Sequence, residues 1–177
     1  MSDLYIRPVL ETDLDALAAL LIETVAHGGS VSFMHPLMEE NSRVFWQSAL
    51  ASMTRGERVV LGAFDGSVLA ATVSVVLDAP PNQPHRAEIA KLMTNTSYRG
   101  RGIARQLMQA AESLAIAHRK TLLILDTAED GGASGLYAKL GYTCAGTIPD
   151  YALKPHGGLS ATVLFWKRLY ADAHVAA

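Results

Sequence analysis

The sequence predicts an α/β domain in which one mixed β-sheet carries helices on its faces, and three observations lead to this class. Short runs rich in Val, Leu and Ala alternate along the chain with longer stretches whose apolar residues recur at helical spacing. An Asp65-Gly66 pair separates two neighbouring runs, as in a β-hairpin. A glycine-rich segment at residues 98–104 follows a predicted strand and opens a predicted helix, as in strand–helix–strand units of parallel sheets.

Length and composition are those of one globular domain. The chain has 177 residues, of which 50% are hydrophobic and 18% are charged, so we expect a single domain over residues 1–177 with a full hydrophobic core. Lys and Arg total 15 against 17 Asp and Glu, which gives a formal net charge of −2. Proteins built to coat nucleic acid are normally basic, so the charge disfavours that class.

Cysteine content and the length of the apolar runs predict a reduced, cytoplasmic protein. Cys144 is the one cysteine of the chain, which excludes an intrachain disulfide and a cysteine-cluster zinc site. Residues 1–7 lack the basic segment and apolar run of a secretory signal. The apolar run at residues 16–22 is far shorter than the ~20 residues that span a membrane.

The first third of the chain predicts a strand and two helices. Alternating apolar residues favour a strand over residues 4–9. We expect Thr12 to cap the first helix, with Asp15 in the place of the usual glutamate partner. The Gly28-Gly29 pair ends that helix. A second helical stretch covers residues 37–53.

The middle of the chain predicts a hairpin followed by a strand–helix–strand unit. Strands over residues 58–64 and 68–77 flank the Asp-Gly pair. A third strand covers residues 86–93, and a helix with one apolar face covers residues 102–118. A short apolar strand of the buried kind follows at residues 121–125. The connection between the strands at residues 86–93 and 121–125 should be a right-handed crossover.

The C-terminal part predicts one short helix and two closing strands. The helix covers residues 134–140 and is ended by Gly141. Strands over residues 142–148 and 159–169 follow, joined by a Pro/Gly loop at residues 149–158. In total the pattern predicts seven strands and four helices.

The glycine-rich segment suggests an anion site. Two glycines at alternate positions, Gly100 and Gly102, allow a tight turn and a close approach of a ligand to the backbone. The first turn of the following helix presents unpaired N–H groups, and Arg99 and Arg101 add positive charge. Such a site fits a phosphate or pyrophosphate.

Two common phosphate-binding motifs are excluded at this segment. The chain has no Gly-x-x-x-x-Gly-Lys-Ser/Thr motif, and Arg105 stands where a dinucleotide-binding fingerprint needs its third glycine. Without other motifs, an ordinary exposed turn before a helix would explain the segment about as well as an anion site does.

Three segments together resemble the GNAT family of acetyltransferases. Arg99-x-x-Gly102-x-Ala104 resembles that family's acetyl-CoA motif, Leu92-Met93-Thr94 its strand beside the pantetheine arm, and residues 136–142 its Leu-Tyr-x-Lys-Leu-Gly-Tyr segment. The order of the predicted elements also matches. The resemblance implies a sheet of about seven strands flanked by about four helices, with acetyl-CoA in the splay between the central parallel strands.

The resemblance also implies which residues contact the cosubstrate. The family's cofactor-binding positions correspond to Leu92, Met93, Thr94, Arg99, Gly100, Arg101, Gly102, Ile103, Ala104, Asp130 and Tyr137. At position 130 the family often has Asn, so the Asp in this chain is a departure from the pattern.

Within the family, several stretches are similar to the tabtoxin resistance acetyltransferases. These stretches are residues 21–34, 86–93, 99–108, 125–127 and 159–169. The similarity implies a small amine acceptor, with a toxin, an antibiotic or an amino-acid-like compound as alternatives.

Three side chains are candidates for the chemistry of acetyl transfer. An alkyl amine with a pKa near ~10 arrives mostly as ammonium and must lose a proton. Glu88 and Asp126 are the candidate bases, because parallel pairing of their strands would place both carboxylates near the mouth between those strands. A solvated charge at a strand end is the alternative for each. Tyr137 matches the family tyrosine that protonates the leaving thiolate, and a backbone N–H near Met93 would stabilise the oxyanion.

The acceptor site is predicted less sharply. By resemblance, Phe33 in the loop after the first helix borders the amine, and Tyr151 lies in the other wall. A peptide acceptor and a non-catalytic acetyl-CoA sensor are alternatives to a small-molecule enzyme, and a homodimer is one alternative for the oligomeric state. The histidines show no metal-ligand spacing such as His-Glu-x-x-His, so we expect no metal cofactor. The net charge and the short apolar runs lead us to expect neither a nucleic-acid nor a membrane partner.

Overall fold

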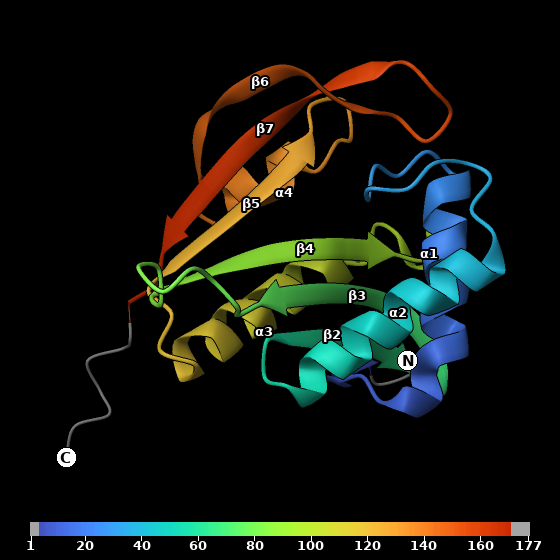
Figure 1. The fold of residues 1–177 in the computed structure, drawn as a ribbon, viewed down its shortest axis with the longest axis horizontal. Helices are drawn as coiled ribbons and strands as arrows, with labels where there is room; N and C mark the ends of the chain where they lie inside the picture. Colours follow the sequence, from blue (N-terminus) through green and yellow to red (C-terminus); the bar gives the residue numbers. More distant parts are fainter. Residues whose placement is uncertain (1–3, 171–177) are drawn as a thin grey trace.

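A single mixed β-sheet organises the computed structural model, which describes residues 4–170 (Figure 1). The strands are β1 (Leu4–Pro8), β2 (Arg58–Asp65), β3 (Val68–Val76), β4 (Arg86–Thr94), β5 (Leu122–Ala128), β6 (Thr143–Leu153) and β7 (Leu159–Arg168). The helices are α1 (Leu14–Ala26), α2 (Glu39–Thr54), α3 (Ile103–Ala117) and α4 (Ser134–Lys139), with short 3₁₀ turns η1 (Glu11–Asp13) and η2 (Thr96–Tyr98). The predicted class, with seven strands and four helices, is confirmed.

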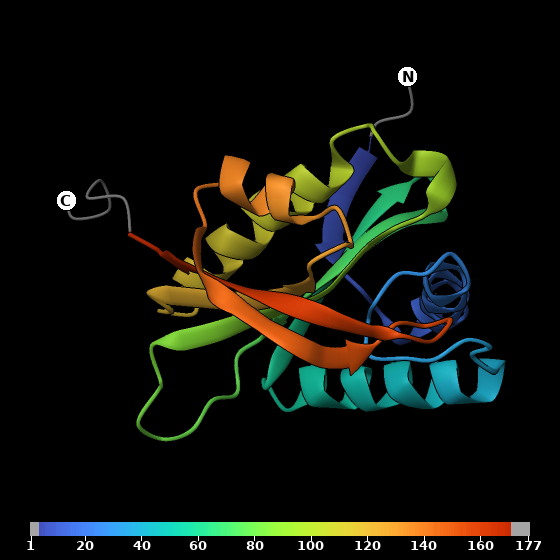
Figure 2. The same cartoon turned by 90° about the horizontal axis from the view of Figure 1, so that it is seen from above.

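The strand order is β1-β2-β3-β4-β5-β7-β6, and β4 with β5 is the parallel pair. Helices α1 and α2 cover one face of the sheet, and α3 and α4 cover the other (Figure 2). Leu107 and Met108 of α3 are completely buried on their face, as are Leu17 and Trp46 on the face of α1 and α2. No helix within residues 4–170 is long and apolar enough to cross a bilayer.

The parallel pair comes apart after three residues. Arg86, Ala87 and Glu88 pair with Leu122, Leu123 and Ile124, but no pairing follows although both strands continue. In Figure 1 the part of the sheet formed by β5, β7 and β6 accordingly diverges from β4. The divergence opens space between two central strands where other sheets have hydrogen bonds.

Besides shifts of one or two residues at other ends, three boundaries differ from the prediction. Thr12 does not cap the first helix, because Asp13 accepts a hydrogen bond from the Leu10 N–H (2.8 Å) and η1 precedes α1. Strand β5 runs to Ala128, so Asp126 lies within a strand and not after it. Strand β6 runs to Leu153 and includes Pro149, which is tolerated because β6 is an edge strand with an irregularity between Ile148 and Ala152.

Asp13 also forms a two-pronged ion pair that fixes the start of the fold. Its carboxylate accepts two hydrogen bonds from the Arg7 guanidinium (2.7 and 3.0 Å), and only 12% of its side chain is exposed. The same guanidinium lies 3.8 Å from the centroid of the Phe64 ring. Hydrogen bonding to Arg7 lowers the pKa of Asp13 below its ordinary value.

Asp13→Asn should lower the free energy of unfolding at neutral pH by about 1–3 kcal/mol, because a charge-assisted pair is lost. A carboxylate whose pKa is lowered in the native state stabilises the fold at pH values above its unfolded-state pKa of about 3.9. This stabilisation is lost as the pH falls through the lower native pKa. The difference between variant and wild type should therefore shrink on acidification, as urea denaturation at several pH values would measure. Asp15→Asn is the control, because the Asp15 side chain is 83% exposed. This substitution should change the free energy of unfolding by less than about 1 kcal/mol. An Asp13→Asn effect independent of pH would contradict the role of the ion pair.

Candidate active site

A cleft of about 920 Å³ occupies the space between the diverging strands β4 and β5. Its walls come from β4, the glycine-rich turn before α3, β5 and the loop after it, α4, the loop after α1, and the β6–β7 hairpin. Catalytic pockets commonly form where central strands of an α/β sheet part.

The glycine-rich turn forms one end of the cleft. Gly100 and Gly102 both have a φ of 75°, a conformation that favours glycine, and no atom lies within 4 Å of a Cβ built on either. Gly102 is the N-cap residue of α3, whose first turn contains no acidic residue. Unpaired N–H groups of this turn, with Arg99 and Arg105 in the cleft wall, therefore form a positive cradle that fits a pyrophosphate.

Arg101 does not share this position. Its guanidinium donates to the Ser97 carbonyl (3.1 Å) and lies 4.9 Å from the centroid of the Tyr98 ring, and the residue does not line the cleft. Of the predicted cofactor-binding residues, all the others line it: Leu92, Met93, Thr94, Arg99, Gly100, Gly102, Ile103, Ala104, Asp130 and Tyr137.

A β-bulge distorts β4 in the middle of the cleft. Ala90 pairs with Ser74 and Met93 with Thr72, so two residues of β4 lie opposite one residue of β3. Lys91 in this bulge has a φ of 52°, and its carbonyl accepts a hydrogen bond from the Thr72 hydroxyl (3.2 Å). Because a bulge interrupts the hydrogen-bond ladder, backbone donors here are available to a ligand.

The two candidate bases lie on one face of the sheet. Glu88 pairs with Ile124, and Asp126 follows two residues later on β5, so both side chains project toward the α1 side and both line the cleft. The Thr162 hydroxyl on β7 donates to Asp126 Oδ2 (2.8 Å), which orients this carboxylate. Both acids are exposed to the cleft.

Tyr137 lies on α4 against the opposite wall. Only 5% of the residue is exposed, and its ring contacts the rings of Tyr142 and Phe165 at centroid distances of 5.9 and 5.6 Å. Burial, with a smaller contribution from Asp126, raises the pKa of Tyr137 to about 12. The phenol therefore keeps its proton at neutral pH and can donate it.

Asp130 has partners within the chain. Its carboxylate accepts hydrogen bonds from the Lys154 ammonium (2.7 Å) and the Ser160 hydroxyl (3.1 Å), which joins the loop after β5 to the β6–β7 hairpin. Lys154, and next Ser160, lower the pKa of Asp130. These contacts give the aspartate a structural role where the family pattern has an amide.

The β6–β7 hairpin covers the end of the cleft at which the sequence predicts the acceptor site. The His35 N–H donates to the Pro155 carbonyl (2.9 Å), and His156 Nε2 lies 3.0 Å from the Ala26 carbonyl oxygen. Figure 2 shows the hairpin reaching over the end of α1. Tyr151 lines the cleft from this hairpin, whereas Phe33 does not line it and packs edge-on against Phe45 (5.2 Å).

Glu23 near the end of α1 connects this helix to the segment that precedes the glycine-rich turn. Its carboxylate accepts from the Asn95 side chain (3.0 Å) and from the backbone N–H (3.0 Å) and hydroxyl (2.5 Å) of Thr96. Asn95 and Thr96 begin the turn that leads from β4 into the glycine-rich segment. One side chain of α1 thus fixes the start of the segment that leads from β4 to the glycine-rich turn.

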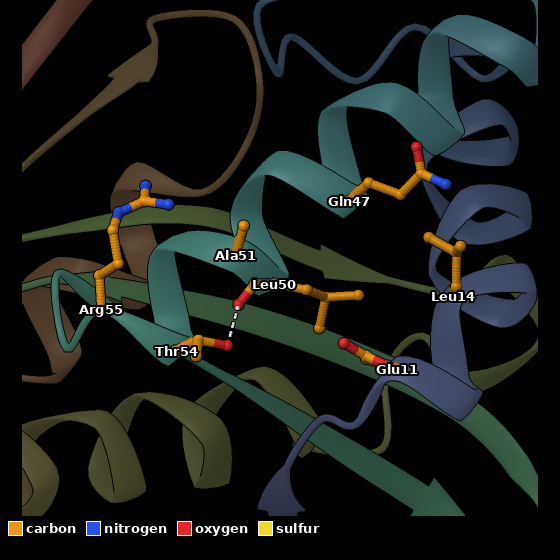
Figure 3. Close-up of a pocket in the computed structure, with 7 residues that line it drawn as sticks. All are labelled: Glu11, Leu14, Gln47, Leu50, Ala51, Thr54 and Arg55. Carbon is orange, nitrogen blue, oxygen red and sulfur yellow. Dashed lines mark hydrogen bonds between the residues drawn. The ribbon is translucent and has the colours of Figure 1, made fainter.

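A second hollow, of about 660 Å³, lies between the start of α1 and α2 (Figure 3). Its charged side chains are Glu11 and Arg55, and Arg55 is paired with Glu57 (2.7 Å). The hollow brings no nucleophile and base together. Within residues 4–170 there is also no cluster of three His, Cys, Asp or Glu side chains that could hold a metal ion.

Sequence reasoning did not find Lys91, Thr162 or Glu23 as residues of the site. Thr162 and Glu23 act through contacts 36 and 73 residues away in the chain, which no local pattern reveals. Lys91 depends on the bulge, and a residue of positive φ inside a strand has no signature in the apolar pattern.

Comparison with known proteins identifies similar sequences and folds. Residues 22–142 match the model of the Acetyltransferase (GNAT) family. An N-acetyltransferase from Staphylococcus aureus Mu50 has a TM-score of 0.82 and 21% identity, over 96% of this chain and 100% of that chain. A candidate acetyltransferase from Salmonella typhimurium with its cofactor acetyl-CoA has a TM-score of 0.78 and 19% identity, over 98% and 96% of the two chains. The ribosomal-protein-alanine N-acetyltransferase from Brucella melitensis has a TM-score of 0.78 and 24% identity, over 93% and 99%.

Proposed function

The chain belongs to the acetyltransferase (GNAT) family of acetyl-CoA-dependent acyltransferases, and we propose that this member acetylates a primary amine of a small molecule. The observation that carries the proposal is that a pyrophosphate-compatible glycine turn, two carboxylates and a buried tyrosine line one cleft. Acetyl-CoA supplies an activated acetyl thioester. The turn at Gly100 and Gly102, together with Arg99, is the proposed binding site for its pyrophosphate.

Glu88 is the proposed general base, with Asp126 as the alternative. The acceptor amine must lose a proton before or during its attack, and a carboxylate can accept that proton directly or through one water. Asp126 accepts a hydrogen bond from Thr162, whereas Glu88 interacts with the charge of Arg58 and has no hydrogen bond from another described residue. That difference favours Glu88 for proton transfer and Asp126 for orienting the ammonium.

Two further groups complete the proposed mechanism. Tyr137 donates a hydrogen bond to the departing sulfur and supplies its proton, consistent with a phenol that is neutral at physiological pH. A backbone N–H at the β4 bulge, near Met93, stabilises the negative charge that develops on the carbonyl oxygen.

Glu88→Gln should slow the reaction most at low pH. Near pH 6 an amine with a pKa of about 10 is almost entirely ammonium, so loss of the base should cost about 100-fold in kcat/KM, and the deficit should shrink toward about pH 9. Steady-state kinetics across this range would measure the ratio of variant to wild type.

Asp126→Asn, measured in parallel, decides which carboxylate is the base. Glu129→Gln, an exposed acid that does not line the cleft, is the control and should follow the wild-type profile. A wild-type pH profile for Glu88→Gln would contradict its assignment as base.

A protein N-terminal amine is the alternative acceptor, since one protein of similar fold is a ribosomal-protein-alanine N-acetyltransferase. The small molecule is favoured because the β6–β7 hairpin is hydrogen-bonded to the loop after α1 over the acceptor end of the cleft. An extended peptide would need that end open. An acetyl-CoA consumption assay with amines, amino acids, β-lactam-type toxins and N-terminal peptides would decide between them.

The biological setting is part of the same proposal. We propose a single catalytic domain over residues 1–177 that works in the cytoplasm, and toxin resistance as one role consistent with a small amine acceptor. Cys144 is exposed on β6 and would remain a thiol in that compartment. A homodimer is one arrangement to test.

A further inference from the structure

Lys91 directs its ammonium into the acceptor end of the cleft. Strand alternation from Glu88 would put Lys91 on the face of α3, but the bulge shifts the alternation and turns the side chain to the face of α1 and α2. There Lys91 Nζ donates to the Ser32 hydroxyl (3.2 Å) and lies 5.9 and 5.6 Å from the centroids of the Phe33 and Phe45 rings. Both Lys91 and Ser32 line the cleft.

No carboxylate within residues 4–170 forms an ion pair with this ammonium. Burial lowers its pKa and Arg58 acts in the same direction, while Asp126 and Glu88 act against them. A neutral hydroxyl and two aromatic rings within cation–π distance offset only part of the cost of removing an ammonium from water, because neither carries a negative charge. The position therefore has a cost that the fold itself does not explain.

The charges around the acceptor end are mixed. Arg58, Val76 and Glu88 occupy one row across β2, β3 and β4, so Arg58 and Glu88 lie on the same face of the sheet. With Lys91 and Asp126 they make a group of two cations and two carboxylates. A simple monoamine, arriving in the cleft as an ammonium ion, would face the ammonium of Lys91 with no anion to offer it.

We propose that Lys91, together with Ser32, binds a carboxylate of the acceptor, and that the acceptor is therefore an amino acid or an amino-acid analogue. The acceptor's ammonium lies toward Glu88 and Asp126, and its carboxylate lies toward Lys91. A zwitterion adds no net charge to the group and gives each side chain an opposite partner. Lys91 is then a specificity-determining residue. This inference rests on the proposed small-molecule acetyltransferase activity.

Matched acceptor pairs test this assignment. Each pair is an L-amino acid and the amine that remains when its carboxyl group is removed, such as leucine with 3-methylbutylamine or phenylalanine with 2-phenylethylamine. Wild-type enzyme should acetylate the amino acid of the best pair with the higher kcat/KM. Lys91→Met should raise KM for that amino acid by about 10- to 100-fold with little change in kcat, and leave KM for the amine unchanged.

Two variants serve as controls. Lys91→Arg keeps the charge and should restore part of the selectivity, which a merely structural lysine would not predict. Lys139→Met, at the exposed end of α4, should behave as wild type. Calorimetry with acetyl-CoA checks that each variant remains folded and binds the cosubstrate.

The possible outcomes separate the two proposals. Acetylation of amines without a preference for the carboxylate, or an equal effect of Lys91→Met on both members of a pair, overturns the role of Lys91 and leaves the proposed function standing. Absence of acetylation for every amino acid and amine, with acetyl-CoA bound, overturns the small-molecule function and the inference that rests on it.

Discussion

Replacing Gly102 with Glu should abolish acetyl-CoA binding. A Cβ at this position meets no protein atom within 4 Å, and Gly102 lines the cleft in which we propose that the cofactor binds. A carboxylate there adds bulk and negative charge at the N-terminus of α3, where the unpaired N–H groups would receive the pyrophosphate. Affinity measured by calorimetry should fall by at least about 100-fold.

Gly56→Glu is the matched control for this prediction. Gly56 has a φ of 74°, against 75° for Gly102, and its added Cβ also meets no atom within 4 Å, but it lies outside the cleft in the turn before β2. Both substitutions therefore introduce the same backbone strain and the same charge. Equal loss of acetyl-CoA affinity in the two variants, or normal affinity in Gly102→Glu, would refute the assignment of the glycine turn.

Replacing Tyr137 with Phe should lower kcat by about 100-fold, the usual contribution of a positioned proton donor, while leaving acetyl-CoA affinity nearly intact. The ring that packs against Tyr142 and Phe165 is retained, so the wall of the cleft keeps its shape. The variant lacks the phenol O–H that we propose protonates the departing thiolate. Stopped-flow or steady-state release of the thiol would measure the change.

Tyr142→Phe separates the chemistry from the packing. Tyr142 is as buried as Tyr137, and burial raises its pKa strongly, but it does not line the cleft. Loss of its hydroxyl should leave kcat close to wild type. Turnover by Tyr137→Phe at the wild-type rate would exclude Tyr137 as the general acid.

The elements that were predicted well are those with strong local patterns. Helix α3 follows the spacing of Ile103, Leu107 and Ala111 closely, and the β2–β3 hairpin follows its Asp-Gly turn. The predicted end of β6 was wrong because Pro149 normally marks a loop, whereas an edge strand needs no donor on its open side. Local sequence does not tell which strand will be at the edge.

The candidate site shows a similar division. Motif spacing predicts the glycine turn and Tyr137 as parts of the site, and the strand position of Glu88 predicts that residue; all of them line the cleft. Lys91 escapes such reasoning, since alternation counted from Glu88 assigns it to the wrong face and only the three-dimensional bulge corrects the count. Likewise, the surroundings of Phe33 and Arg101 depend on partners that the motif does not include.

The contacts of the Glu23 carboxylate have a thermodynamic consequence for the coupling between the affinities of the two ligands. The carboxylate belongs to α1, which borders the acceptor end, yet it holds Asn95 and Thr96 at the entrance of the cofactor loop. A ligand that orders either partner of this contact spares the other ligand part of the ordering entropy. Linkage makes the effect reciprocal: whatever factor acetyl-CoA contributes to acceptor affinity through Glu23, the acceptor contributes equally to acetyl-CoA affinity.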